Sequence, residues 1–349
     1  MFDPRWLRVP SSACIGDDPI ESNQPILDLQ NISKRYGRHH ALRDVSVRLP
    51  TGVVGLLGPN GSGKSTLIKA ILGLVSVDSG RGRVLDCQWP SQTRVVRDRV
   101  GYLPEDDCYI HGLQGIESIQ MMARLSGLRK TEALRRAHEV ADFCDMAQER
   151  YRNVETYSTG MRQKLKFAQA LVHDPQWIIL DEPTTGLDPA QREQFLHRIS
   201  VLAREKGKSI FLSTHILHDV QQVCDSVVIL VGGQVRLIDT LENLQRPSQA
   251  GLQVSVVSDA QKLVEALRRL GVDARATGYV DLIVAGDDAE TVRRIWQAST
   301  ASGVLVQRVD QARNSLEKSF IDAVQAVDGA KSGGSFASAE ASGSIRSGV

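Results

Sequence analysis

Short apolar runs alternate with longer amphipathic segments over residues 25–245, which is typical of an α/β domain with a largely buried sheet. The apolar runs predict strands, and apolar residues three or four positions apart predict helices. Strands are predicted at residues 26–29, 45–49, 53–57, 99–103, 177–180, 209–213 and 226–231.

Residues 106–175 break this rhythm and predict a series of helices. Within 131–145, for example, Leu134, Ala137, Ala141 and Cys144 fall three or four positions apart, with charged residues between them. We therefore expect a helical subdomain at about 106–175, inserted into the sheet domain.

A second block of strands and helices occupies residues 252–326. Alternating apolar residues open it at 252–256, and Leu263, Leu267 and Leu270 then recur at helical spacing before Gly271. Strands at 280–285 and 304–309 and helices at 289–298 and 315–324 complete a small α/β accessory domain. This block has no glycine-rich phosphate loop and no paired catalytic carboxylates, so its sequence does not indicate its role.

Both ends of the chain differ from these two blocks. Residues 1–24 contain scattered prolines among polar residues and show no sustained period, which predicts a flexible N-terminal arm. Residues 328–349 are mostly Gly, Ser and Ala, which bury too little apolar surface to offset chain entropy. We expect a disordered tail there.

Composition and charge narrow the class of protein. The 349 residues include 42 Lys and Arg against 41 Asp and Glu, a net charge of +1. Proteins that bind nucleic acids usually carry a basic excess, so no nucleic-acid partner is expected. The five cysteines form no C-x-x-C pair, which favours reduced thiols over disulfides or a metal site.

Hydropathy bears on where the protein works. The apolar runs are far shorter than the roughly 20 residues that a membrane helix needs. The first residues also lack the apolar segment of about 7 to 15 residues that a secretory signal requires. We expect the protein to stay in the cytoplasm.

A glycine-rich loop stands between the predicted strand 53–57 and an amphipathic helix. Its sequence, G-P-N-G-S-G-K-S-T, matches the phosphate loop of P-loop NTPases in the strand–loop–helix context that such a loop needs. The glycines let successive backbone N–H groups face one anion at a helix N-terminus. Lys64 is expected to reach the β- and γ-phosphates, and Ser65 to bind Mg²⁺. The predicted nucleotide-binding residues here are Gly58, Pro59, Asn60, Gly61, Ser62, Gly63, Lys64, Ser65 and Thr66.

A pair of carboxylates follows the apolar strand at 177–180. The strand places Asp181 at its carboxyl end, the edge where α/β sheets bind ligands. We expect Asp181 to contact Mg²⁺ through a water molecule. We expect Glu182 to act as the general base that activates the attacking water. Taken without the phosphate loop, the pair could equally be two solvated carboxylates at a strand end.

The order of these motifs resembles that of the ATP-binding cassette (ABC) family, specifically the ATPase subunits of transporters. Besides the phosphate loop and Asp181-Glu182-Pro183, the match rests on Y-S-T-G-M at 157–161, G-L-D-P at 186–189 and S-T-H at 213–215. It covers about residues 25–245. The resemblance implies a P-loop NTPase cassette of the α/β class with an inserted helical subdomain, followed here by the small α/β domain.

The resemblance implies roles for further residues that bind nucleotide. Tyr36 is similar to the aromatic residue that stacks on adenine, although by itself it could be an ordinary surface or core tyrosine. Ser158 and Gly160 resemble the signature that closes on the ATP held by the opposite subunit. A plain helix cap is the alternative for this segment.

Two more roles follow from the resemblance. His215 is similar to the family's switch histidine, which contacts the γ-phosphate; its alternatives are a loop histidine or a metal pair with His218. Asp188 resembles the aspartate that couples the two sites across a dimer. Two identical chains, arranged head to tail, would then enclose two ATP molecules.

The chain departs from the usual family pattern at two places. The signature reads Y-S-T-G-M instead of L-S-G-G-Q, and Glu105 stands where many members carry a glutamine that senses Mg²⁺. Glutamate keeps an oxygen acceptor, so Glu105 joins Ser65 and Asp181 as a predicted magnesium contact. Both departures resemble the exporter-type branch, whose members often read Y-S-x-G-M-R-Q and tend to end in a segment similar to residues 315–320.

The resemblance implies an ATPase that binds ATP and Mg²⁺, forms a homodimer on ATP and drives a separate transmembrane permease subunit as an exporter. Such a subunit would be peripheral on the cytoplasmic face of the membrane. One alternative is a soluble ABC ATPase acting on DNA or the ribosome; those relatives usually carry two cassettes, a coiled-coil insertion or a zinc module. Another is a P-loop kinase, which would have no use for Ser158 or His215.

Overall fold

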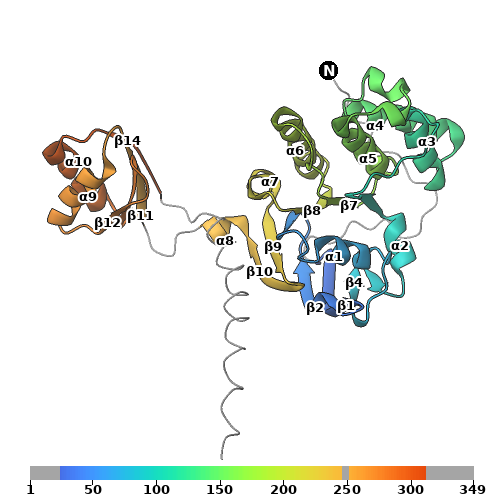
Figure 1. Cartoon of the computed structure of the whole chain (residues 1–349), viewed down its shortest axis with the longest axis horizontal. Coiled ribbons are helices and arrows are strands. Elements are labelled where there is room, and N and C mark those ends of the chain that lie inside the picture. The colour runs from blue at the N-terminus through green and yellow to red at the C-terminus, as the bar shows by residue number, and fades with distance from the viewer. Residues whose placement is uncertain (1–23, 246–250, 312–349) are drawn as a thin grey trace, which may run out of the picture. The chain divides into compact units, whose positions relative to one another are not determined.

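The computed structural model describes residues 24–245 and 251–311, which belong to two compact units, one extending to Asp239 and the other beginning at Thr240 (Figure 1). The predicted arm, apart from residue 24, lies outside the described residues, as do the predicted tail at 328–349 and the predicted helix at 315–324. The described cysteines, Cys87, Cys108, Cys144 and Cys224, form no disulfide.

A six-stranded sheet with the order β10-β9-β3-β8-β7-β6 forms the centre of the larger unit. The pairings recorded from β9 through β6 are all parallel. Every residue of β3, β7, β8 and β9 is buried, which explains why these strands are continuous apolar runs and not alternating ones. The strands are β3 (Val53–Leu57), β6 (Val100–Leu103), β7 (Trp177–Asp181), β8 (Ser209–Thr214), β9 (Ser226–Val231) and β10 (Gln234–Thr240).

A second, antiparallel sheet has the order β2-β1-β4-β5. Its strands are β1 (Leu27–Tyr36), β2 (His39–Leu49), β4 (Ser79–Val84) and β5 (Cys87–Trp89). The apolar residues of this sheet join α1 and one face of the parallel sheet in a single core that includes Leu27, Leu67 and Phe211. The α1 helix (Lys64–Ile71) follows β3 directly across the glycine-rich loop.

The chain between β6 and β7 forms a group of helices with no strand of its own in the described residues. It consists of α3 (Gly115–Leu125), α4 (Lys130–Phe143) and α5 (Thr159–Leu171), with two short 3₁₀ turns between α4 and α5. These helices pack against one another and lie together in Figure 1. Outside this group the larger unit contains α2 (Thr93–Asp98), α6 (Pro189–Arg204) and α7 (Leu217–Val223), and α8 (Leu241–Gln245) belongs to the unit that begins at Thr240.

The sequence pattern did not predict four of the strands, and the segments that it predicted for two others are shorter than the strands themselves. Nothing apolar marks β4, whose residues S-G-R-G-R-V alternate between exposed and intermediate positions until Val84. Strand β10 was also missed because none of its residues is buried, and β5 and β12 were missed because three residues are too few to show a strand pattern. Strands β1 and β2 extend past the predicted segments into a polar hairpin, where Tyr36 pairs with His39.

The smaller unit is a four-stranded antiparallel sheet with the order β12-β13-β11-β14. Its chain order of strand, helix, two strands, helix and strand is the ferredoxin-like arrangement. Leu263, Leu282 and Ile295 belong to a hydrophobic core of its own. Its elements are β11 (Gly251–Val256), α9 (Ala260–Arg269), β12 (Ala274–Ala276), β13 (Asp281–Ala285), α10 (Ala289–Ser302) and β14 (Val306–Gln311).

Candidate functional site

The glycine-rich loop turns sharply between the last residue of β3 and the first residue of α1. Gly61 and Gly63 have φ values of 77° and 105°, a region that side chains rarely adopt. A Cβ atom at Gly58 would lie 2.3 Å from the backbone oxygen of Leu230, and one at Gly63 would lie 2.5 Å from that of Ala41. Backbone cannot move aside easily, so these positions require glycine. Pro59, Asn60, Ser62 and Thr66 complete the loop and its junction with α1.

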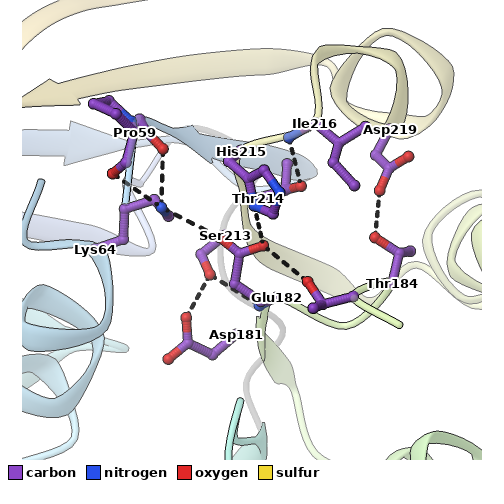
Figure 2. A network of polar contacts seen from close by, with 12 residues as sticks. Pro59, Lys64, Asp181, Glu182, Thr184, Ser213, Thr214, His215, Ile216 and Asp219 are labelled. Carbon is purple, nitrogen blue, oxygen red and sulfur yellow. Dashed lines mark hydrogen bonds and ion pairs between the residues drawn. The ribbon is translucent and has the colours of Figure 1, made fainter. Parts of the chain in front are cut away.

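Lys64 lies across this loop and is only 6% exposed. Its Nζ donates to the backbone oxygen of Gly58 at 2.9 Å and lies 3.2 Å from Oε1 of Glu182 (Figure 2). The hydroxyl of Ser62 is buried without a hydrogen-bond partner. A buried ammonium and an unpartnered hydroxyl in a loop of this geometry suit a bound phosphate.

Asp181 ends β7 and is 1% exposed. Its Oδ1 accepts hydrogen bonds from the hydroxyls of Ser213, at 2.5 Å, and Ser65, at 3.2 Å. Burial raises the pKa of the Asp181 carboxyl, and these two hydrogen bonds oppose that shift. Its Oδ2 is buried with no partner. Carboxylate and hydroxyl oxygens are the donors that Mg²⁺ prefers, so Ser65 and Asp181 fit this ion.

Glu182 follows in a left-handed backbone conformation, with φ at 49°. Its N–H donates to the backbone oxygen of Ser213 at 3.1 Å, which holds this strained turn against β8. Its Oε2 lies 2.9 Å from Nδ1 of His215, and its Oε1 faces Lys64 (Figure 2). The fold therefore brings Lys64, Glu182 and His215 together from the ends of β3, β7 and β8.

Glu105 lies in the loop after β6 and lines a polar hollow of about 230 Å³ with Glu182 and the N-terminal half of α5. The hydrogen bonds recorded for Asp181 come from Ser65 and Ser213. Within residues 24–245 and 251–311, no three His, Cys, Asp or Glu side chains form a metal-binding group. Glu105 thus lines the same hollow as Glu182, while the oxygen pair suited to Mg²⁺ comes from Ser65 and Asp181.

Tyr36 stands at the end of β1, where the residue is 47% exposed. The Nζ of Lys34 lies 5.2 Å from the centre of this ring. The ring is therefore accessible to a planar ligand and has a cation beside it.

Ser158, Gly160 and Asp188 form a separate group. Ser158 caps α5, its Oγ accepting from the N–H of Met161 at 3.4 Å, and Asp188 caps α6 by accepting from the N–H of Gln191 at 2.9 Å. A Cβ atom at Gly160 would lie 2.6 Å from Oε1 of Gln191, so the two helix N-termini approach closely. None of these recorded contacts reaches the glycine-rich loop.

Sequence reasoning gave no role to several polar residues that organise the site. Ser213 bonds to both Asp181 and the backbone of Glu182, and polar residues at the end of an apolar strand are the signal that points to it. Asp219 is fully buried on α7 and accepts from the hydroxyl of Thr184 at 2.5 Å. Burial raises the pKa of Asp219. Nothing in the sequence distinguishes Asp219 from an exposed helix carboxylate.

Comparison with known proteins bears on the identity of this site. The family described as ABC transporter matches residues 42–185. The uncharacterized ABC transporter ATP-binding protein YxlF of Bacillus subtilis (strain 168) is 32% identical over 311 residues, covering 86% of this chain and 100% of the relative. The chain belongs to the ABC transporter ATP-binding proteins. The predicted family and fold class are thereby confirmed.

Two further similarities support this family. The linearmycin resistance ATP-binding protein LnrL of B. subtilis (strain 168) is 29% identical over 304 residues, which are 85% of this chain and 97% of that protein. A solved structure of an ATP-binding subunit of an ABC transporter is 31% identical, with a TM-score of 0.57, covering 63% of this chain and 91% of that one. No helix among the described parts of this ABC protein is long and apolar enough to cross a membrane.

Proposed function

We propose that this ABC protein is the ATP-hydrolysing subunit of an exporter and that it couples Mg-ATP-driven dimerisation to a separate membrane permease. The observation that carries the proposal is the convergence of Lys64, Glu182 and His215 at one edge of the sheet. In this cluster Lys64 is a cation that can bind phosphate and Glu182 is a carboxylate that can activate water. His215 is a polar group that can orient the Glu182 carboxylate.

The roles of the residues follow from their contacts. Lys64 and the N–H groups of the glycine-rich loop bind the phosphates. Ser65 and Asp181 would hold Mg²⁺, and the bound ion would neutralise charge on the β- and γ-phosphates. Glu182 orients the attacking water and accepts its proton, and His215 orients the Glu182 carboxylate through the contact at its Oε2.

A homodimer accounts for the residues that lie elsewhere. Ser158 and Gly160 stand at the N-terminus of α5, where backbone N–H groups suit a γ-phosphate, yet their recorded contacts do not reach their own phosphate loop. In the proposed dimer they close on the ATP held by the other copy. Asp188, beside them at the cap of α6, couples the two sites, and Tyr36 stacks on the adenine.

The export assignment rests on relatives. The name of one full-length relative describes resistance to linearmycin, and resistance mediated by an ABC protein is most simply export. We place the chain on the cytoplasmic face of the membrane, where its permease holds it.

The alternative is an ABC ATPase that acts on DNA or the ribosome. Association with nucleic acid in the absence of any membrane protein would favour that alternative.

Glu182→Gln tests the proposal most directly. The amide cannot accept the proton from water, so ATP hydrolysis should fall by about 10²- to 10⁴-fold while ATP still binds. With Mg-ATP the variant should accumulate as a stable dimer, measured by size-exclusion chromatography with light scattering. Glu193→Gln, which changes an exposed carboxylate on α6, is the matched control and should behave like wild type. Unchanged turnover in Glu182→Gln would refute the assigned base, and a monomeric ATP complex would refute the dimer.

A further inference from the structure

Lys166 is a buried lysine on α5 whose ammonium group is directed to the backbone of another segment. The side chain is 4% exposed. Its Nζ donates to the backbone oxygens of Pro104 and Glu105, both at 3.0 Å, and of Asp106 at 3.4 Å. An ammonium group has three protons, so three successive carbonyls satisfy it completely.

The clamped segment belongs to the site proposed above. Pro104, Glu105 and Asp106 form the loop that leaves β6, and Glu105 and Lys166 line the same hollow as Glu182. The α5 helix begins at the Ser158 cap, and the rise over the eight residues that follow Ser158, up to Lys166, is about 12 Å. Lys166 therefore joins the loop that carries Glu105 to the helix that carries the signature.

Charge favours this clamp. Burial lowers the pKa of Lys166, whereas Cys108 and the carboxylates of Asp107, Asp106 and Glu105 oppose that shift. These three acidic residues offset part of the cost of burying the ammonium charge. One turn earlier on the same face of α5, Arg162 pairs with Asp107 at 2.7 Å. The loop and the helix are thus joined at two successive turns.

A close backbone approach provides a further anchor for α5. A Cβ atom at Gly101 in β6 would lie 2.2 Å from the backbone oxygen of Ala170. Lys166 holds the next part of the same segment, one helical turn away. A helix that is fixed at both points cannot shift without moving the loop that carries Glu105.

We propose that Lys166 is a positioning residue that makes the Glu105 loop and the signature end of α5 move as one body, so that the state of one active site is transmitted to the signature serving the other. This inference rests on the proposed ATPase dimer. It assigns to Lys166 no contact with ATP.

A double-mutant cycle on the full-length chain tests this. Lys166→Met keeps the length and apolar stem of the side chain but removes the ammonium. We expect kcat for ATP hydrolysis to fall roughly tenfold, the effect of losing hydrogen bonds to a charged group. ATP affinity, measured in the Glu182→Gln background at protein concentrations too low for the dimer to form, should stay unchanged. Glu105→Gln should alter kcat in wild type but have little further effect in Lys166→Met, because the link between loop and signature is already broken.

Controls separate positioning from simple stability. Lys164→Met changes another α5 lysine, which donates to the backbone oxygen of Asp145, and it should leave the Glu105 effect intact. Lys166→Arg keeps a cation with several N–H donors and should restore much of the coupling. If Lys166→Met does not fold, Lys166→Gln, which lacks the positive charge and is too short to reach all three carbonyls, takes its place in the cycle. Hydrogen exchange of the amides at 105–110 should accelerate in Lys166→Met and not in Lys164→Met.

The outcomes distinguish this inference from the proposed function. Additive effects of Glu105→Gln and Lys166→Met on kcat, or a Lys166→Met variant that matches wild type, would overturn the inference and leave the ATPase intact. A wild-type chain that neither hydrolyses ATP nor dimerises would overturn the proposed function and this inference together.

Discussion

Asp181 and Glu182 are consecutive carboxylates, yet the end of β7 gives them different surroundings. Asp181 accepts from the hydroxyls of Ser65 and Ser213, while the left-handed turn at Glu182 directs the next carboxylate toward Lys64 and His215. Different surroundings let two acids of similar intrinsic strength take different roles. We assign the first to the metal and the second to water on this basis.

The burial of Asp181 also predicts how its charge affects the stability of the folded protein. Because burial raises its folded pKa, the carboxyl contributes stability below its unfolded pKa of about 3.9, and that contribution is lost as pH rises through the folded pKa. At neutral pH the buried charge therefore costs stability. Asp181→Asn removes the charge and keeps an acceptor oxygen. Without nucleotide, its thermal midpoint at pH 7.5 should exceed wild type by about 2–4 °C, the shift for about 1 kcal/mol.

The dependence of the thermal midpoint on pH, and its response to Mg-ATP, test whether the buried charge of Asp181 has this effect. The gap in midpoint between Asp181→Asn and wild type should narrow as pH falls through the raised folded pKa of Asp181. Added Mg-ATP should stabilise wild type and have less effect on the variant. Asp98→Asn, an exposed change at the end of α2, should show no such pattern. A variant that is less stable than wild type at neutral pH would contradict the argument.

At the scale of elements, the unusual first residue of the signature has a structural reason. Tyr157 precedes the cap of α5 and is 3% exposed, and its hydroxyl donates to the backbone oxygen of Glu149 at 2.6 Å. A Cβ atom at Gly115, at the start of α3, would lie 2.1 Å from this hydroxyl. Tyrosine here therefore attaches the signature segment to the rest of the helical group, which leucine could not do by hydrogen bonding.

The cap of α6 allows structural and functional roles to be separated. Asp188 accepts from the N–H of Gln191, so Asp188→Ala should cost about 1 kcal/mol of stability, measured by urea denaturation. Asp188→Asn keeps a good cap and should retain wild-type stability. If Asp188 couples the two sites through its charge, both variants should lose ATPase activity. Full activity in a stable Asp188→Asn would limit this residue to capping.

At the scale of the whole molecule, each unit has a hydrophobic core of its own. Leu282 in β13 is fully buried in the smaller core. Leu282→Ala should destabilise that unit by about 2–5 kcal/mol, seen as an earlier unfolding transition in calorimetry. ATP hydrolysis should persist below that transition, because every residue assigned to catalysis lies in the larger unit. Leu270→Ala, at a 40% exposed position of the same unit, is the control. Loss of ATPase activity in folded Leu282→Ala would show that catalysis depends on the smaller unit.

Local patterns in the sequence were sufficient to predict the strand, glycine loop and helix of residues 53–72. The phosphate loop could be predicted in this way because its residues are consecutive in the chain. They were also sufficient for the buried parallel strands, which must be apolar on both faces. The polar strand β4 was missed, since its place in a sheet is set by pairing with β1 and not by its own hydrophobicity.

The sequence by itself determined which residues carry the chemistry, and tertiary structure alone decided which of them meet. Lys64, Glu182 and His215 are distant in the chain, and they converge because β3, β8 and β7 are adjacent parallel strands whose carboxyl ends share one edge. The role inferred for Lys166 depends entirely on the tertiary structure. A lysine in an amphipathic helix predicts a solvent-exposed charge, and only the packing of α5 on the loop after β6 surrounds this one with carbonyl groups that replace water.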